Sequence, residues 1–153
     1  MSRIEKSSRI DRSVDLENWI YVSETLLPPE QAATEVRSIV QLSRTRNPTL
    51  NITGALIFTG SRFSQLIEGP AAGIRALQSS IYADQRHRQV TTISEGYLER
   101  RAFDGWSLVY SGDSRYMAGL LNAVELGCIQ SQLVHASIMQ LFEEFSINTD
   151  PIR

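Results

Sequence analysis

Residues 52–70 read ITGALIFTGSRFSQLIEGP, and this segment predicts a β-hairpin. Its first half, Ile52 to Phe58, is a dense apolar run that is typical of a buried strand. Thr59-Gly60-Ser61 predicts a turn, and Arg62 to Glu68 predicts the antiparallel partner strand. Gly69-Pro70 ends that strand and opens the helix that follows it.

The segments on both sides of the hairpin predict further strands and helices. The predicted elements are a strand at 19–23, a helix from Pro29 to Asn47, the hairpin, a helix between Gly69-Pro70 and the polar loop 84–88, a strand at 90–98 with a bulge at Gly96, and a last strand at 106–110. The order β-α-β-β-α-β-β predicts an α+β, ferredoxin-like fold. Its mixed sheet carries two helices on one face and is followed by a C-terminal helical extension.

The predicted elements divide the chain into three parts. Residues 1–16 are polar and aperiodic and predict a flexible N-terminal arm, residues 17–111 form the domain, and residues 112–153 form a helical tail. The tail has more apolar positions than one stripe needs. We therefore expect its helices to cover the open face of the sheet and to contribute to a homo-oligomer or a partner-protein site.

The composition excludes several classes of protein. With 153 residues, 42% hydrophobic residues, 21% charged residues and a net charge of -2, the chain is typical of a globular domain and not of a non-specific nucleic-acid binder. One cysteine and two histidines make a metal site unexpected. No apolar run is long enough for a membrane span and the N-terminus lacks the apolar core of a signal peptide, so we expect a cytoplasmic protein.

Sequence motifs give no support to an enzymatic function. The chain contains no GxGxxG segment, no Walker A loop and no GxSxG segment, and its carboxylates are scattered. A familiar dinucleotide-binding, nucleotide-hydrolysing or serine-hydrolase site is therefore not predicted.

A few polar residues interrupt otherwise apolar faces. Gln65 shares its strand face with Phe63 and Ile67, so its amide is expected to be buried and hydrogen-bonded. Ser43 and Asn47 continue the apolar face of the first helix, and Tyr21 shares its strand face with Trp19. Each of these is, taken alone, compatible with ordinary packing. Together they predict an apolar cavity with a few donors and acceptors, which suits a flat heteroaromatic ligand.

The run Asp84-Gln85-Arg86-His87-Arg88 follows the second helix. One interpretation is a solvated charged turn. The other uses Arg86 and His87 as donors to an anionic or carbonyl-rich ligand.

Several short segments in the same order resemble the BLUF family, which senses blue light with a flavin. They are Tyr21-Val22-Ser23, Arg46-Asn47 with Asn51-Ile52-Thr53-Gly54-Ala55-Leu56, Phe63-Ser64-Gln65-Leu66-Ile67-Glu68-Gly69-Pro70, Asp84-Gln85-Arg86-His87, and Arg101-Ala102-Phe103-Asp104-Gly105-Trp106. The resemblance runs from about Trp19 to Tyr110.

The resemblance implies a photoreceptor that holds FAD between its two helices. Tyr21 matches the family's electron donor, Gln65 matches its hydrogen-bonding switch, and Asn47 matches the residue that holds the carbonyl and imide edge of the flavin. The full implied cofactor-binding set is Ser43, Arg46, Asn47, Gln65, Asp84, Arg86 and His87.

The resemblance also implies signal output through Trp106 and Leu108. Because the segment after Tyr110 is too short for an output domain, we expect any effector to be a separate protein. Position 108 departs from the family pattern, because methionine is common there and leucine lacks the thioether sulfur. Two other functions remain open at this point. One is a small acyl-phosphate hydrolase on the same scaffold that would use Arg46 and Asn47, and the other is a flavin-free interaction module.

Overall fold

The computed structural model of the chain describes residues 15–105, 107–112, 136, 139, 140, 142 and 143. Its elements are β1 (Leu16–Thr25), α2 (Pro29–Arg46), the 3-10 helix η1 (Asn47–Leu50), β2 (Thr53–Phe58), β3 (Arg62–Gly69), α3 (Ala71–Ala83), β4 (His87–Leu98) and β5 (Val109–Gly112). This order is the predicted one. Leu16 already lies in β1, and residues 1–14 of the predicted arm are outside the described part of the chain.

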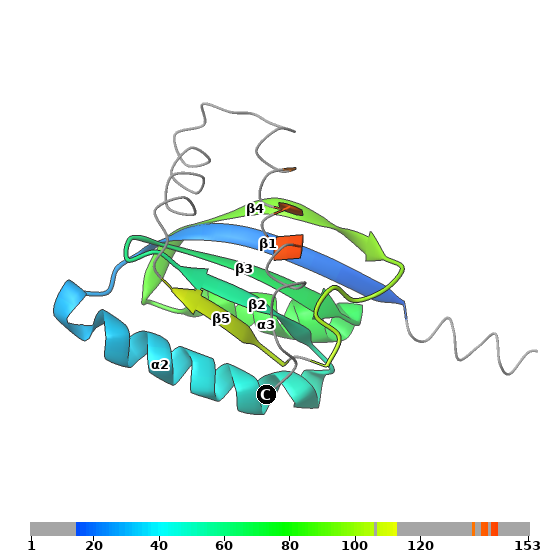
Figure 1. The fold of residues 1–153 in the computed structure, drawn as a ribbon, viewed down its shortest axis with the longest axis horizontal. Helices are drawn as coiled ribbons and strands as arrows, with labels where there is room; N and C mark the ends of the chain where they lie inside the picture. Colours follow the sequence, from blue (N-terminus) through cyan, green and yellow to red (C-terminus); the bar gives the residue numbers. More distant parts are fainter. Residues whose placement is uncertain (1–14, 106, 113–135, 137–138, 141, 144–153) are drawn as a thin grey trace, which may run out of the picture.

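The five strands form one sheet in the order β4-β1-β3-β2-β5 (Figure 1). Neighbouring strands are antiparallel except for β2 and β5, which are parallel, so the prediction of a mixed sheet is confirmed. Val36 and Val40 of α2 and Ile74 and Leu77 of α3 pack on the same face of the sheet. Two helices therefore cover one face, as predicted.

The opposite face of the sheet carries a second apolar cluster. Its buried members are Ile20, Val22, Ala55, Ile57, Leu66, Ile93, Phe103, Val109 and Phe142, with Met139 packed against them. The rings of Phe103 and Phe142 meet edge to face, with centroids 6.5 Å apart. Phe142 and Met139 belong to the predicted tail, so this part of the tail lies on the face that α2 and α3 leave open. Most other tail residues lie outside the described part of the chain.

The last strand begins at Val109, three residues later than the sequence predicts. The side-chain amide of Asn47 donates to the carbonyl oxygen of Ser107 at 2.8 Å, and Arg44 Nε donates to that of Leu108 at 3.1 Å. These two backbone acceptors therefore bind side chains of α2 and η1 instead of the backbone of β2, which delays the start of strand pairing.

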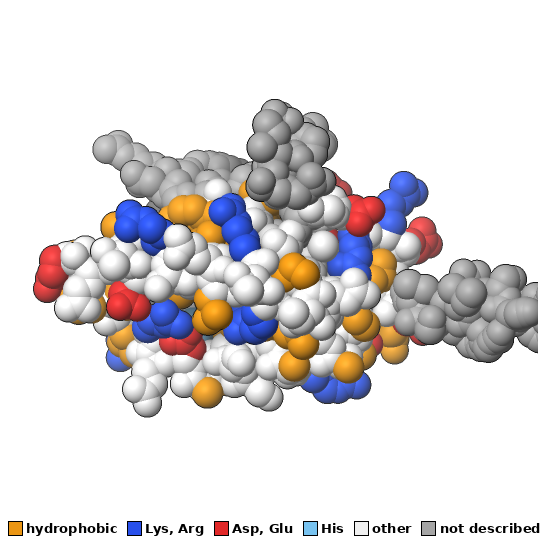
Figure 2. Space-filling model, turned by 90° about the horizontal axis from the view of Figure 1, so that it is seen from below, with side chains coloured by type: hydrophobic (Ala, Val, Ile, Leu, Met, Phe, Trp, Pro, Cys, Tyr) orange, Lys and Arg blue, Asp and Glu red, His pale blue; other side chains and the backbone are white. Residues whose placement is uncertain are grey.

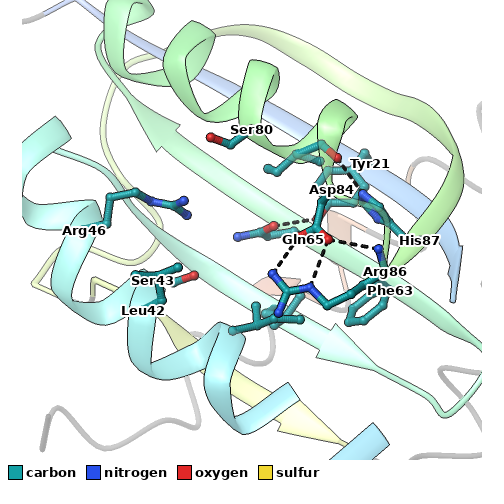
Figure 3. Close-up of a pocket in the computed structure, with 13 residues that line it drawn as sticks. Tyr21, Leu42, Ser43, Arg46, Phe63, Gln65, Ser80, Asp84, Arg86 and His87 are labelled. Atoms are coloured by element: carbon teal, nitrogen blue, oxygen red, sulfur yellow. Dashed lines mark hydrogen bonds and ion pairs between the residues drawn. The ribbon is translucent and has the colours of Figure 1, made fainter. Parts of the chain in front are cut away.

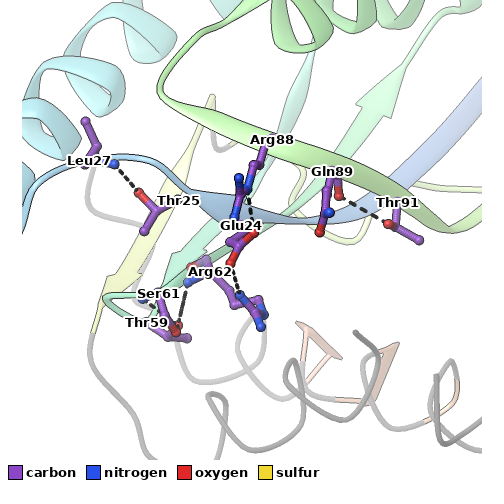
Figure 4. A network of polar contacts seen from close by, with 9 residues as sticks. All are labelled: Glu24, Thr25, Leu27, Thr59, Ser61, Arg62, Arg88, Gln89 and Thr91. Carbon is purple, nitrogen blue, oxygen red and sulfur yellow. Dashed lines mark hydrogen bonds and ion pairs between the residues drawn. The ribbon is translucent and has the colours of Figure 1, made fainter. Parts of the chain in front are cut away.

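Glu24 lies near the end of β1 between Arg62 of β3 and Arg88 of β4 (Figure 4). Its carboxylate is 2.7 Å from Arg88 Nε and 3.8 Å from Arg62 Nη1, and the hydrogen bond from Arg88 lowers the pKa of Glu24. β4 begins at His87, which pairs with Thr25, although the sequence predicts a loop through Arg88. The strand is longer than predicted because β1 itself extends to Thr25.

The predicted bulge at Gly96 is wrong, since Gly96 pairs in register with Asn18. The register between β1 and β4 shifts at two other places, between Ile20 and Tyr21 and between Val22 and Glu24. The two register shifts therefore lie on either side of the buried residues Tyr21 and Val22.

Candidate functional site

A cavity lies between α2 and α3 on the helix-covered face of the sheet (Figure 3). Its lining residues are Tyr21, Ile39, Leu42, Ser43, Arg46, Leu56, Phe63, Gln65, Ser80, Ile81, Asp84, Arg86 and His87. On the α2 side of the molecule, acidic and basic side chains are interspersed with apolar ones (Figure 2). The structure thus brings together every predicted switch and cofactor-binding residue except Asn47, which lies beside the cavity without lining it.

Tyr21 and Gln65 are direct partners across β1 and β3. Tyr21 Oη donates a 2.7 Å hydrogen bond to Gln65 Oε1, and both side chains are buried. Burial raises the pKa of Tyr21, the charge of Asp84 raises it further, and Arg46 partly opposes both effects. The phenol is therefore a hydrogen-bond donor at neutral pH, while the amide nitrogen of Gln65 points into the cavity (Figure 3).

The C-terminal end of α2 carries two buried polar atoms without a hydrogen-bond partner in the part of the chain that the structure describes. They are Arg46 Nε and Asn47 Oδ1. The guanidinium group of Arg46 extends from α2 into the cavity, and burial lowers its pKa. An unsatisfied buried polar group costs about 1–3 kcal/mol, so these atoms indicate that a ligand completes the site.

Asp84 and Arg86 form a bidentate ion pair between α3 and β4. Arg86 Nε and Nη2 each lie 2.9 Å from the Asp84 carboxylate, and Arg86 Nη1 lies 3.3 Å from Glu35 of α2. The hydrogen bond from Arg86 lowers the pKa of Asp84, and the same bond raises the pKa of Arg86. The pair is therefore more than a solvated turn, because it connects α2 to the end of α3.

His87 is held by both of its ring nitrogens. Nε2 lies 2.7 Å from the carbonyl oxygen of Ile81, and Nδ1 lies 2.7 Å from Ser23 Oγ. A carbonyl oxygen only accepts, so Nε2 carries a proton and donates. In this arrangement the edge and face of the ring, and not a ring nitrogen, are available to a ligand.

The remaining predicted site residues fall into two groups. Ser43 is buried and lines the cavity, whereas Leu108 is buried among side chains of α2, β2 and β3. Trp106 lies outside the described residues. Glu35 and Ser80 were not predicted as site residues. Glu35 contacts Arg86 only through the tertiary structure, and the only sequence signal for Ser80 is its position next to the apolar stripe of α3.

The described residues contain no group of three or more His, Cys, Asp or Glu side chains that could hold a metal ion. None of the helices in the described part of the chain is long and apolar enough to cross a bilayer.

The fold and the cavity define a class of protein, the α+β ferredoxin-like domains with a ligand site between two helices. The dark-state structure of BlrB, a BLUF protein, matches with a TM-score of 0.75 and 27% identity, covering 90% of this chain and 99% of that one. The ground-state structure of BlsA matches in fold, with a TM-score of 0.71 and 17% identity, and covers 90% of this chain and 91% of that one.

Curated relatives agree with these structural matches. The chain is 30% identical over 74 residues to the blue light- and temperature-regulated antirepressor BluF of Escherichia coli (strain K12), which is 48% of this chain and 18% of that protein. It is also 30% identical over 89 residues to the photoactivated adenylate cyclase subunit beta of Euglena longa, which is 58% of this chain and 10% of that protein. The chain thus spans less than a fifth of the length of these relatives.

The family model for BLUF, described as sensors of blue-light using FAD, matches residues 16–109. The chain belongs to the BLUF family. BLUF domains bind flavin and act as blue-light photoreceptors.

Proposed function

We propose that this chain is a blue-light sensor and not an enzyme, that it binds FAD between α2 and α3, and that Tyr21 and Gln65 form its switch. The observation that carries this proposal is the buried hydrogen bond from Tyr21 to Gln65 at the cavity wall. A bound flavin supplies absorption of blue light and, when excited, a strong electron acceptor. A hydrolase that used Arg46 and Asn47 would leave the Tyr21–Gln65 pair without a role.

The polar atoms around the cavity fit the edge of a flavin ring. Gln65 offers an amide nitrogen and Arg46 offers Nε, which are both donors, and Asn47 offers Oδ1, which is an acceptor. The pyrimidine edge of flavin has an N–H donor between two carbonyl acceptors. This complementarity supports these three residues as the ones that hold the ring, and Ser43, Asp84, Arg86 and His87 complete the proposed set.

The proposed switch begins with proton-coupled oxidation of Tyr21. Its phenol is buried and un-ionised, so loss of an electron to the excited flavin must be accompanied by loss of the phenolic proton. Gln65 Oε1 is at 2.7 Å and is placed to accept that proton. The electron donor and the proton acceptor are thus adjacent before light is absorbed.

Gln65 then changes its hydrogen bonds. In this structure its oxygen accepts from Tyr21 while its nitrogen faces the cavity. Because the two ends of an amide differ as acceptor and donor, rotation or tautomerisation exchanges the pattern presented to the ring. A rearranged bond to a flavin carbonyl produces a small red shift of the yellow absorption.

The proposed output passes through the segment before β5 and the C-terminal tail. Asn47 and Arg44 donate to the carbonyl oxygens of Ser107 and Leu108, so α2 is bonded to this segment. We assign signal output to Trp106 and Leu108, and we assign contact with a separate effector and homo-oligomer formation to the tail. Truncation after residue 111 is expected to change the oligomeric state measured by light scattering; an unchanged state and unchanged partner binding would remove the tail from this role.

The test of the site is an absorption spectrum after reconstitution with FAD. We expect a yellow protein with a light-induced red shift. Tyr21→Phe and Gln65→Leu should each retain flavin and lose the shift, whereas the matched surface variants Tyr97→Phe and Gln41→Leu should retain both. A colourless protein would contradict the proposal and favour a flavin-free module or an acyl-phosphate hydrolase. A normal shift in Gln65→Leu would place the switch elsewhere.

A further inference from the structure

Three aromatic rings form a continuous series from the cavity to the surface. The centroid of Trp19 lies 4.8 Å from that of Tyr21 and 5.7 Å from that of Tyr82 on α3, and the ring planes are inclined by 34° and 38°. Rings at these separations are in contact. Tyr21 and Trp19 are buried, whereas Tyr82 is 57% exposed. The series therefore joins the cavity to solvent.

The residue types in this series are suited to single-electron transfer. Indole and phenol rings lose one electron more readily than other aromatic side chains, and electron transfer weakens steeply with distance, so contacting rings provide a route. Trp19 Nε1 donates a 2.9 Å hydrogen bond to Thr92 Oγ1, which fixes the indole between the two tyrosines. A phenylalanine at position 82 would fill the same space without being an electron donor.

We propose that Trp19 and Tyr82 conduct electrons from solvent to Tyr21 under blue light, so that the domain takes up single electrons from a small thiol reductant. This activity rests on the proposed function, because the bound and light-excited flavin is the oxidant. Electron uptake occurs only in those excitations in which Trp19 gives an electron to oxidised Tyr21 before the electron on the flavin returns to Tyr21.

Each step balances. Tyr21 gives one electron to the flavin and its phenolic proton to Gln65. Trp19 then gives one electron to the oxidised Tyr21, which recovers its proton from Gln65. Tyr82 gives one electron to the oxidised Trp19 and releases its phenolic proton to water.

The thiol completes the sequence at the surface. It gives a hydrogen atom to the Tyr82 radical and restores the phenol, and two thiyl radicals combine to form a disulfide. The net result of each event is that one electron moves from the thiol to the flavin and one proton enters the solvent.

The experiment uses the full chain reconstituted with FAD and illuminated without oxygen in the presence of dithiothreitol. The first readout is the rate at which the flavin absorption bleaches. The second, obtained without the thiol, is covalent capture of protein radicals by a nitroso spin trap, with the labelled residue identified by peptide mass spectrometry.

We expect light-dependent labelling of Tyr82. Trp19→Phe should abolish that labelling, and both Trp19→Phe and Tyr82→Phe should slow the bleaching severalfold. Tyr97→Phe is the matched control, because Tyr97 is more exposed, at 81%, and lies outside the ring series. The control should leave the bleaching rate and the Tyr82 label unchanged.

Labelling of Tyr82 that persists in Trp19→Phe would overturn the proposal, as would equal bleaching rates in wild type and Tyr82→Phe. If Trp19→Phe does not fold, the surface variant Tyr82→Phe alone decides. The two proposals fail differently: a chain that shows the red shift but no Tyr82 label overturns only the electron route, whereas a chain that binds no FAD overturns the proposed function as well.

Discussion

The two faces of β3 each bury a polar side chain, Gln65 toward the helices and Glu68 toward the open face. Glu68 is fully buried, and its carboxylate accepts hydrogen bonds from Thr53 Oγ1 and from the backbone N–H groups of Ala102 and Phe103, at 2.7–2.9 Å. These bonds satisfy the carboxylate with groups from β2 and from the segment between β4 and β5.

The buried polar groups on the helix-covered face have fewer of their hydrogen bonds made. Tyr21 and Gln65 are bonded to each other, but Arg46 Nε and Asn47 Oδ1 have no partner in the described part of the chain. A fully satisfied buried network adds rigidity, whereas a partly satisfied one costs stability until a ligand completes it. The buried polar groups of the open face therefore contribute to stability, and those of the covered face are suited to binding a ligand.

Removing the Glu68 carboxylate is the strongest way to test this division. Glu68→Leu removes the acceptor of the buried N–H group of Phe103 and of the part-buried N–H group of Ala102 and hydroxyl of Thr53, and we expect a loss of about 3 kcal/mol in the free energy of unfolding. Equilibrium urea unfolding measures it. The exposed variant Glu99→Leu should change stability by no more than about 0.5 kcal/mol. Equal stability of the two variants would contradict a structural role for Glu68.

Replacing Arg46 should leave stability unchanged or raised and should weaken flavin binding. Arg46→Met removes a buried donor without a partner, so the flavin-free protein should be as stable as wild type or more stable. The dissociation constant for FAD, measured by flavin fluorescence, should rise by about tenfold, the equivalent of one hydrogen bond. Arg37→Met on the exposed side of α2 serves as the control. A destabilised protein with normal FAD affinity would place Arg46 among the structural residues.

The hairpin and both helices could be predicted from the sequence because their periodicity and their Gly and Pro boundaries are local signals. Gln65 was also predictable, since Phe63 and Ile67 flank it on one strand face. The role of Glu68 was not, because its partners lie 15, 34 and 35 residues away. The start of β5 was wrong for the same reason: the side chains of Asn47 and Arg44 take its backbone acceptors.

The raised pKa of Tyr21 makes the stability of the covered face depend on pH. Its pKa is raised in the folded state, so above about pH 10, the usual value for tyrosine, the unfolded chain loses a proton that the folded chain keeps. Stability contributed by this phenol is therefore present below that pH and is lost as the pH rises. Tyr21→Phe should cost about 1 kcal/mol at neutral pH and should reduce the alkaline decline in urea stability. An unchanged decline would contradict the assignment.

Leu108→Met is expected to have only a small effect on stability and on flavin binding. The volumes are similar, so the cost should stay under about 1.5 kcal/mol, with unchanged FAD affinity. If Leu108 belongs to the output path, the added sulfur should alter the rate of dark recovery or the amide infrared difference spectrum. Identical recovery and identical spectra would make Leu108 an ordinary member of the covered face.

β4 is the outermost strand on its side of the described sheet, and its pairing register with β1 shifts at two places. Gln89, within this strand, also has a left-handed backbone with φ of 57°. A regular outer strand is a template on which a strand of another molecule can add, and bulges spoil that template by twisting the edge. The irregular register beside Tyr21 therefore also makes this edge of the sheet a poor template for edge-to-edge pairing between molecules.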